Sequence, residues 1–333
     1  MAPILKIQLA VYVPVYDVNS LGQRCGCIMV TPAEDMRYEE NRIFLSLLTG
    51  PLSPEDPKLL SHLKSNVIIG PGSGNYNLRM LEAANPANSA YNNYLAHPVG
   101  FPPLQKILRA LFDSRPPGFF VEAGALDGEY LSNTLYLERI KGWTGLLVEP
   151  DDKMFARLLG KNRKAWAANC CLSTKPYPVQ ETLVTMSNDQ NKLYEVGFKA
   201  MNALFSSPMA SRSEGAAHST YSQVQCFPLL SLLKALGVTQ VDFISLDIEG
   251  VEDEVVRSFL NQDGGILVDV WMVEHQNPGT VLKDETDHAF INWFASKGYS
   301  LYAIAKDAPI FNYVFVRTTS SLYDSVFVGR NKP

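Results

Sequence analysis

One segment, Phe119-Phe-Val-Glu-Ala-Gly-Ala-Leu-Asp-Gly-Glu129, has the pattern of a buried strand that passes through a glycine turn toward a helix. Its apolar run has the length of a strand and ends at Glu122, and glycines follow at positions 124 and 128. A strand, a turn and a helix in this order form ligand sites at the carboxyl ends of parallel strands. Gly124 would let the backbone approach a ligand, and Gly128 would allow close packing of strand and helix.

On either side of this turn, apolar runs of strand length alternate with helical segments. We expect further strands at 146–148, 166–172, 241–246 and 266–273, and helices at 104–112, 132–140, 151–161, 228–236, 251–260 and 288–296. Segments 299–304 and 313–316 are predicted to close the sheet as a hairpin. Strands that alternate with helices predict an α/β fold, in which a mostly parallel sheet is covered on both faces.

The regular pattern also divides the chain into parts. Residues 1–100 are predicted to form a partly irregular N-terminal extension, 101–320 the α/β domain, and 321–333 a C-terminal tail. Between about 174 and 225 the alternation of strands and helices breaks down. An insertion of this length is either a functional lid or a disordered segment, and both alternatives stay open at this point.

The composition is that of a globular protein with a small acidic excess. The 333 residues carry 29 Lys and Arg against 34 Asp and Glu, which gives a net charge of −5. This balance speaks against a dedicated nucleic-acid-binding protein, which normally has a basic surplus. No run reaches the roughly 18 to 20 apolar residues of a membrane helix, so no membrane span is expected.

The cysteine pattern bears on the compartment. The chain has five cysteines, two of them adjacent, and no Asn-x-Ser/Thr acceptor site; the cysteines are Cys25, Cys27, Cys170, Cys171 and Cys226. An odd count with an adjacent pair favours a reducing compartment over a disulfide framework. We therefore expect a cytoplasmic protein.

Acidic residues at two strand ends indicate the kind of ligand. Glu149 ends the second strand about twenty residues beyond Gly128, where a carboxylate can accept hydrogen bonds from ribose hydroxyls. Glu122 and Asp127 make the first turn acidic, and carboxylates repel phosphate groups. They suit a cationic nucleoside ligand without phosphates, such as S-adenosylmethionine (SAM), better than a nicotinamide cofactor or ATP.

A second acidic constellation follows the predicted strand 241–246. Asp247 would lie at the same sheet edge. Burying a carboxylate at the end of a strand costs free energy, so its presence there favours a functional role. The next predicted strand along the chain ends at Glu274 and His275, and His275 is either a general base or a partly buried histidine that bonds the backbone. A metal held by Asp247, Glu274 and His275 is conceivable from the ligand types, but their spacing does not favour it, and none is predicted.

Four segments resemble the FkbM-type methyltransferases. They are Phe119-Phe-Val-Glu-Ala-Gly-Ala-Leu-Asp-Gly-Glu, Leu131-Ser-Asn-Thr-Leu-Tyr-Leu-Glu-Arg, Gly142-Trp-Thr-Gly-Leu-Leu-Val-Glu-Pro and Ser245-Leu-Asp-Ile-Glu-Gly-Val-Glu. The resemblance spans roughly residues 52 to 317 and is closest to the animal Star-like branch, whose namesake regulates growth-factor ligand trafficking. It implies a Rossmann-like class I methyltransferase fold, with a seven-stranded, mostly parallel sheet and helices on both faces.

The resemblance also assigns roles to residues. Glu122, Gly124, Asp127 and the neighbouring Gly128 would line the methionine end of SAM, and Glu149 would hold the ribose. The adenine would lie near Asn169 or Cys170, and Asp247 would face the transferred methyl group or the substrate. The chain departs from the broader class I pattern at Leu126, where that pattern has glycine and many FkbM-type proteins have asparagine.

Two functions are consistent with these residues. The first is a SAM-dependent methyltransferase that modifies an oxygen or nitrogen of an unidentified small molecule or sugar, with Asp247 or His275 deprotonating an oxygen acceptor. The alternative is a Star-like, catalytically degenerate fold that binds a protein partner in trafficking or signalling through residues 1–100 or the insertion. That alternative would place the protein in the ER, Golgi or endosomes. A nicotinamide oxidoreductase fits the sheet but not the acidic turn.

Overall fold

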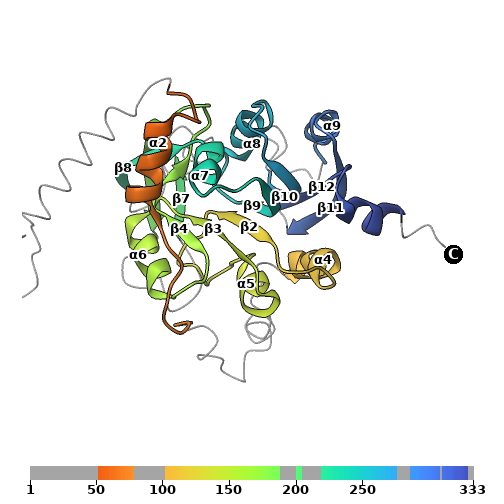
Figure 1. Ribbon diagram of the computed structural model, residues 1–333, viewed down its shortest axis with the longest axis horizontal. Coiled ribbons are helices and arrows are strands. Elements are labelled where there is room, and N and C mark those ends of the chain that lie inside the picture. The colour runs from red at the N-terminus through yellow and green to blue at the C-terminus, as the bar shows by residue number, and fades with distance from the viewer. Residues whose placement is uncertain are drawn as a thin grey trace, which may run out of the picture. The chain divides into compact units, whose positions relative to one another are not determined.

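The computed structural model describes residues 52–78, 102–187, 200–204, 219–275, 286–307 and 310–328 (Figure 1). All of them belong to one compact unit that extends from Leu47 to Pro333. Within these residues, the helices are too short or too polar to cross a bilayer.

The centre of the fold is an eight-stranded sheet in the order β1-β4-β3-β2-β9-β10-β12-β11. Its strands are β1 (Ile68–Ile69), β4 (Trp166–Ala168), β3 (Thr144–Val148), β2 (Phe119–Ala123), β9 (Gln240–Leu246), β10 (Leu267–Glu274), β12 (Ile310–Arg317) and β11 (Tyr299–Asp307). The five strands from β4 to β10 are mutually parallel. The predicted hairpin at the far edge is confirmed, because β11 and β12 pair antiparallel and β12 pairs antiparallel with β10.

The eighth strand corrects the predicted count of seven. β1 comes from the N-terminal extension and pairs antiparallel with β4 through Ile68 and Ile69. An open edge strand exposes unpaired N–H and C=O groups, and β1 covers part of that edge. A strand of two residues shows no periodicity, so the sequence pattern does not reveal it.

Helices lie on both faces of this sheet, as predicted. Figure 1 shows α7 (Leu229–Ala235), α8 (Glu252–Leu260) and α9 (His288–Ser296) on one side, and α4 (Pro102–Phe112) and α5 (Leu135–Lys141) on the other. The apolar stripe of α4 is buried in the main core at Leu104, Leu108 and Phe112. The expected helix at 132–140 begins only at Leu135, because the residues before it are bound to Glu122.

The N-terminal residues 52–78 pack on the edge of the α/β body. Here α2 (Pro57–His62) is followed by a π-helix, η1 (Leu63–Val67), and then by β1. The Ser231 hydroxyl of α7 donates to the Pro54 carbonyl at 2.7 Å, and Lys164 Nζ donates to the Gly72 carbonyl at 2.7 Å. The α6 helix (Asp152–Gly160) ends beside this segment, where the Asn77 side-chain amide donates to the Gly160 carbonyl at 3.0 Å.

The insertion forms much of a second sheet, with the order β5-β8-β6-β7. Its strands are β5 (Cys171–Leu172), β6 (Val179–Ser187), β7 (Ala200–Leu204) and β8 (Ser219–Phe227), and we refer to them together as the insertion sheet. These segments are therefore folded, while the rest of the predicted insertion, at 188–199 and 205–218, lies outside the described residues.

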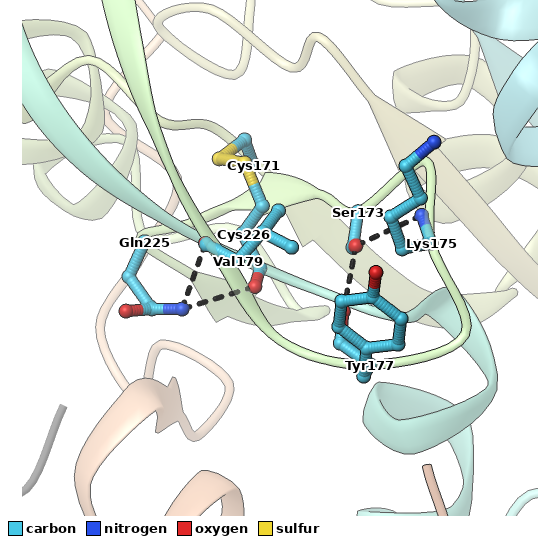
Figure 2. Close-up of a disulfide and its surroundings, with 7 residues drawn as sticks. All are labelled: Cys171, Ser173, Lys175, Tyr177, Val179, Gln225 and Cys226. Atoms are coloured by element: carbon cyan, nitrogen blue, oxygen red, sulfur yellow. Dashed lines mark hydrogen bonds between the residues drawn. A yellow bond between two sulfur atoms is a disulfide. The ribbon is translucent and has the colours of Figure 1, made fainter. Parts of the chain in front are cut away.

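A disulfide joins Cys171 of β5 to Cys226 of β8 at the base of the insertion sheet (Figure 2). The cysteine pattern did not predict this bond, because an odd number of cysteines with an adjacent pair does not show which of them meet. The strand register decides it, because β5 and β8 pair in parallel with Cys171 opposite Cys226. Cys170 is a free, buried thiol, and Cys25 and Cys27 lie outside the described residues.

Candidate functional site

Four strands deliver carboxyl groups to one edge of the main sheet. Glu122 lies in β2, Glu149 follows β3, Asp247 follows β9, and Glu274 ends β10. The strands are parallel neighbours, and the register that places Leu246 opposite Val273 brings Asp247 and Glu274 side by side. The carboxyl edge of the sheet is the expected position of a ligand in this class of fold.

Gly124 is required where the ends of β2 and β9 approach each other. Its φ of +80° lies in the left-handed region, and a Cβ at this position would stand 1.8 Å from the carbonyl oxygen of Asp247. The Asp247 amide in turn donates to the Ala123 carbonyl at 3.2 Å. The absence of a Cβ at Gly124 therefore lets the turn after β2 pack against the segment after β9, rather than only opening space for a ligand.

Gly128 packs against α6, in agreement with its predicted role. A Cβ there would meet Leu158 Cγ at 3.0 Å, and the backbone has a φ of +77°. The Gly128 carbonyl accepts a hydrogen bond from the Arg163 guanidinium. Close contact with the helix thus fixes the end of the turn that begins at Gly124.

Glu149 holds the same turn from the neighbouring strand. Its Oε2 accepts a hydrogen bond from the Leu126 amide at 2.8 Å, and its Oε1 accepts one from the Asp151 amide at 2.9 Å. The side chain is 2 % exposed, and burial raises the pKa of Glu149 to about 7. Each carboxylate oxygen has two lone pairs, so the group can still accept hydrogen bonds from a ribose.

Leu126 adopts a left-handed conformation, with a φ of +48°. This geometry explains why glycine or asparagine suits the position, since a bulky side chain strains the backbone there. We expect Leu126→Asn to be as stable as the parent protein, and Leu126→Val to lose about 1–2 kcal/mol of unfolding free energy. Urea denaturation of the two variants checks this, and the opposite order of stability would contradict it.

Glu122 organises the loop between β2 and α5. It accepts hydrogen bonds from the Ser132 hydroxyl at 2.8 Å, the Asn133 amide at 2.6 Å and the Thr134 hydroxyl at 2.5 Å. Burial raises the pKa of Glu122, while the nearby Arg163 guanidinium and these hydrogen bonds act in the opposite direction. Its carboxylate is therefore engaged by the protein, and it holds the loop before α5 in place.

Cations balance the acidic residues of the first turn. Lys161 Nζ lies 2.5 Å from Glu129 Oε2 and 3.3 Å from Asp127 Oδ2, and all three side chains are largely buried. Asp127 Oδ1 also accepts hydrogen bonds from the Glu129 amide at 3.0 Å and the Tyr130 amide at 2.8 Å. The turn is therefore less acidic than its sequence suggests, because Lys161 offsets part of the charge of Asp127 and Glu129.

Carboxyl groups concentrate instead beyond β9 and β10. Asp247 and Glu274 lie side by side just where β9 and β10 end. Burial raises the pKa of both, and the carboxyl groups of Asp247, Glu252 and Glu249 raise that of Glu274 further. Burial, followed by the charges of Asp247 and Glu252, raises the pKa of Glu249 to about 8.

Glu252 shapes the loop that carries these groups. Its Oε1 accepts from the Ile248 amide at 2.8 Å and its Oε2 from the Gly250 amide at 2.9 Å. Burial raises the pKa of Glu252 to about 7 against the effect of these hydrogen bonds. Glu252, in the first turn of α8, thus holds the backbone of the loop after β9 at Ile248 and Gly250.

His275 is turned away from this group. Its Nε2 lies 3.0 Å from Asp287 Oδ2, and its ring stacks on Phe290 of α9 at a centroid distance of 3.9 Å. Successive side chains of a strand point to opposite faces, so Glu274 rather than His275 meets Asp247. In the described part of the chain, no set of three His, Cys, Asp or Glu side chains is placed to hold a metal ion.

The two residues expected near an adenine lie just after β4. Asn169 Nδ2 donates to Asp152 Oδ1 at 3.1 Å in a partly exposed position. Cys170 is 1 % exposed, and burial raises the pKa of its thiol. Only Asn169 therefore offers a polar group near the surface, whereas Cys170 offers an apolar contact.

The sequence placed Glu274 at this edge without assigning it a catalytic or binding role, and it did not point to Lys161 or Arg163. Glu274 has a signal in its position, because it ends a strand next to the one that ends at Asp247. Lys161 and Arg163 are basic residues in a helix-to-strand connection, and nothing in their spacing shows that they neutralise buried acids.

Comparisons with known proteins agree with this geometry. The profile of the Methyltransferase FkbM domain matches residues 122–301, and no curated protein matches the chain. A magnesium protoporphyrin IX methyltransferase from Synechocystis with bound SAM is 8% identical over 71% of this chain and 88% of that chain, with a TM-score of 0.34. A TehB-like SAM-dependent methyltransferase from Corynebacterium glutamicum is 10% identical over 68% and 94%, with a TM-score of 0.32. These scores are too low to carry an argument, so the topology and the domain match define the fold.

Proposed function

The chain belongs to the FkbM methyltransferase family, and from this premise we propose that it binds SAM and transfers a methyl group to an oxygen or nitrogen acceptor. The observation that supports this most is that Glu149 and the neighbouring Asp247 and Glu274 all lie at the carboxyl edge of one sheet, at the ends of β3, β9 and β10. Glu149 can bind a ribose, and Asp247 and Glu274 can face a cationic methyl donor and its acceptor.

The residues of this edge fit the parts of the cofactor. Glu149 would accept hydrogen bonds from the ribose hydroxyls, and Asn169 with Cys170 would border the adenine. The methionine end would lie along the turn from Gly124 to Gly128, whose conformation Glu149 and Arg163 maintain. The carboxyl groups near Asp247 favour the positive charges of an ammonium and a sulfonium group through short-range Coulomb attraction.

When bound, SAM supplies an electrophilic methyl group on a positively charged sulfur. The protein gains rate chiefly by holding an acceptor in line with that methyl group. For a hydroxyl acceptor, Asp247 or Glu274 would take the proton, because burial raises the pKa of both carboxyl groups and so makes their ionised forms stronger bases. We propose this pair in place of Asp247 and His275, since His275 is engaged by Asp287.

Isothermal titration with SAM and S-adenosylhomocysteine tests the proposal directly. We expect the parent protein to bind both ligands, and Glu149→Gln to bind each at least tenfold more weakly, because it loses one acceptor toward the ribose and disturbs the turn at Leu126. The matched control is Asp263→Asn, an exposed change between α8 and the amino end of β10, at the opposite end of that strand from Glu274, which should leave the affinity unchanged. Absence of binding in the folded parent protein would refute the proposed function.

The affinity should also depend on pH through Glu149. Its pKa is raised to about 7, so the carboxylate that accepts from ribose hydroxyls is scarce below that pH and dominant above it. The SAM dissociation constant is therefore expected to fall about tenfold between pH 6 and pH 8 in the parent protein. In Glu149→Gln this dependence should be much weaker, and an equal dependence in both proteins would assign it to other groups.

The Asp247–Glu274 pair is tested by single-turnover kinetics once an acceptor is found. A screen of hydroxylated small molecules and sugars with labelled SAM would identify that acceptor.

The partner-binding alternative, a Star-like degenerate fold, becomes the preferred function if the protein folds but binds neither SAM nor S-adenosylhomocysteine. Its supporting feature is Leu126, whose side chain occupies a left-handed position in the cofactor turn.

A further inference from the structure

We propose that the Cys171–Cys226 disulfide is a positioning element of the cofactor site, which holds the insertion sheet against the Asp247–Val251 loop. The inference rests on the proposed function, because it concerns the affinity of that site for SAM. It joins three observations: the place of the disulfide in the chain, the apolar cluster around it, and a polar contact from the insertion sheet to the Glu149 side of the site.

The disulfide closes the base of the insertion. Cys171 comes directly after the residues expected near the adenine, and Cys226 lies 55 residues later, at the end of β8. The parallel register of β5 and β8 continues beyond the disulfide, with Leu172 opposite Phe227. Figure 2 shows the disulfide among the strands of the insertion sheet, where Gln225 Nε2 donates to the Val179 carbonyl at 2.8 Å.

The two cysteines belong to a small apolar cluster that is separate from the main core. This cluster combines side chains of the insertion sheet with side chains of the Asp247–Val251 loop, namely Cys171, Leu183, Cys226 and Val251, with Val179, Val224 and Ile248 partly buried around them. Ile248 and Val251 flank the strained backbone of Glu249, which has a φ of +62°. The loop that presents Asp247 thus depends on the insertion sheet for its apolar support.

The insertion sheet also reaches the other half of the site. The Thr185 hydroxyl of β6 donates to Asp151 Oδ2 at 3.3 Å. Asp151 caps α6, and its amide donates to Glu149 Oε1 at 2.9 Å. The insertion sheet therefore contacts both the loop after β9 and Asp151, the residue that bonds Glu149. The Cys171–Cys226 disulfide links two strands of this sheet covalently.

Reduction would release this anchor. A dithiol reductant breaks the S–S bond by transferring two electrons and two protons, which leaves two thiols on the protein and converts the dithiol to its own disulfide. The neighbouring Cys170 does not compete in the oxidised protein, because burial raises its pKa and keeps it as an unreactive thiol. We expect the reduced protein to remain folded but to hold the Asp247–Val251 loop less tightly.

The test compares oxidised full-length protein, the same protein reduced with dithiothreitol, and the Cys171→Ala/Cys226→Val double variant. Non-reducing peptide mapping should first show Cys171 linked to Cys226. SAM affinity, measured by titration at a temperature where all forms are folded, should fall at least tenfold in the reduced and double-variant proteins. Hydrogen exchange should accelerate selectively at residues 247–251 and in β6, and the melting temperature should fall by on the order of 10 °C.

The control is the Cys25→Ser/Cys27→Ser double variant, which removes two other cysteines and should keep both the linked peptide and the response to dithiothreitol. A purely stabilising cross-link would lower the melting temperature on reduction without changing the affinity of the folded state, and that outcome would overturn the proposal. Absence of the linked peptide from the native protein would overturn it as well. If the oxidised protein binds no SAM, the proposed function fails. Faster hydrogen exchange at residues 247–251 on reduction would still show that the disulfide holds this loop.

Discussion

Gly124→Ala is expected to lose at least about 3 kcal/mol of unfolding free energy, enough to leave much of the protein unfolded or aggregated. The added methyl group would stand 1.8 Å from the Asp247 carbonyl oxygen, where real Cβ atoms are not found. Neither neighbour can move easily, because the contact is with backbone at the junction of two central strands. Urea denaturation followed by circular dichroism measures the loss.

Gly237→Ala is the matched control for that variant. Gly237 has a similar left-handed φ of +71°, but a Cβ there meets nothing within 4 Å. It should therefore lose only the conformational cost, about 1 kcal/mol. If Gly124→Ala loses no more than Gly237→Ala, the close approach of the two strand ends is not a constraint on the fold.

Arg163→Met is expected to lose about 3–5 kcal/mol, because it leaves buried carboxyl groups without their cation. The Arg163 side chain is 1% exposed, and its Nε donates to Glu138 Oε2 at 2.9 Å. The guanidinium also bonds the Gly128 carbonyl and the Ser132 and Thr134 hydroxyls, the last two at 3.3 and 3.1 Å. Its loss should both lower the unfolding free energy and weaken SAM binding through the turn.

Two further variants separate the charge from the packing. Arg163→Met combined with Glu138→Met should regain part of the lost stability, because it removes a buried charge together with its partner. Arg257→Met breaks a half-exposed pair with Asp253, and it should lose about 1 kcal/mol or less. Equal losses for Arg163→Met and Arg257→Met would contradict the importance of the buried network.

Much of the fold could be predicted from sequence, and the failures have particular causes. The turn at Gly124, the parallel strands and the C-terminal hairpin all follow from local patterns, and the structure contains them. The helix expected from Ser132 starts three residues later, because Glu122 draws the amide and hydroxyl groups of residues 132–134 into its own hydrogen bonds. β1 is too short to produce a pattern at all.

The site could be predicted in position but not in its pairings. Glu149 and Asp247 come to the carboxyl edge of the sheet because each ends a parallel strand, which a single sequence can show. The partner of Asp247 is Glu274 rather than His275, because alternation along β10 sends consecutive side chains to opposite faces. If the end of β10 is predicted one residue too late, His275 is placed where Glu274 lies.

The sequence alone determined the α/β class, the family and the edge of the sheet where the chemistry belongs, since these depend on the spacing of apolar residues and glycines along the chain. The tertiary structure decided which charges neutralise each other, with Lys161 and Arg163 meeting the acids of the first turn and of α5. It also decided that Cys171 meets Cys226. These partners lie tens of residues apart in the sequence, and strand register and helix packing bring them together. A local sequence pattern cannot show such a pairing.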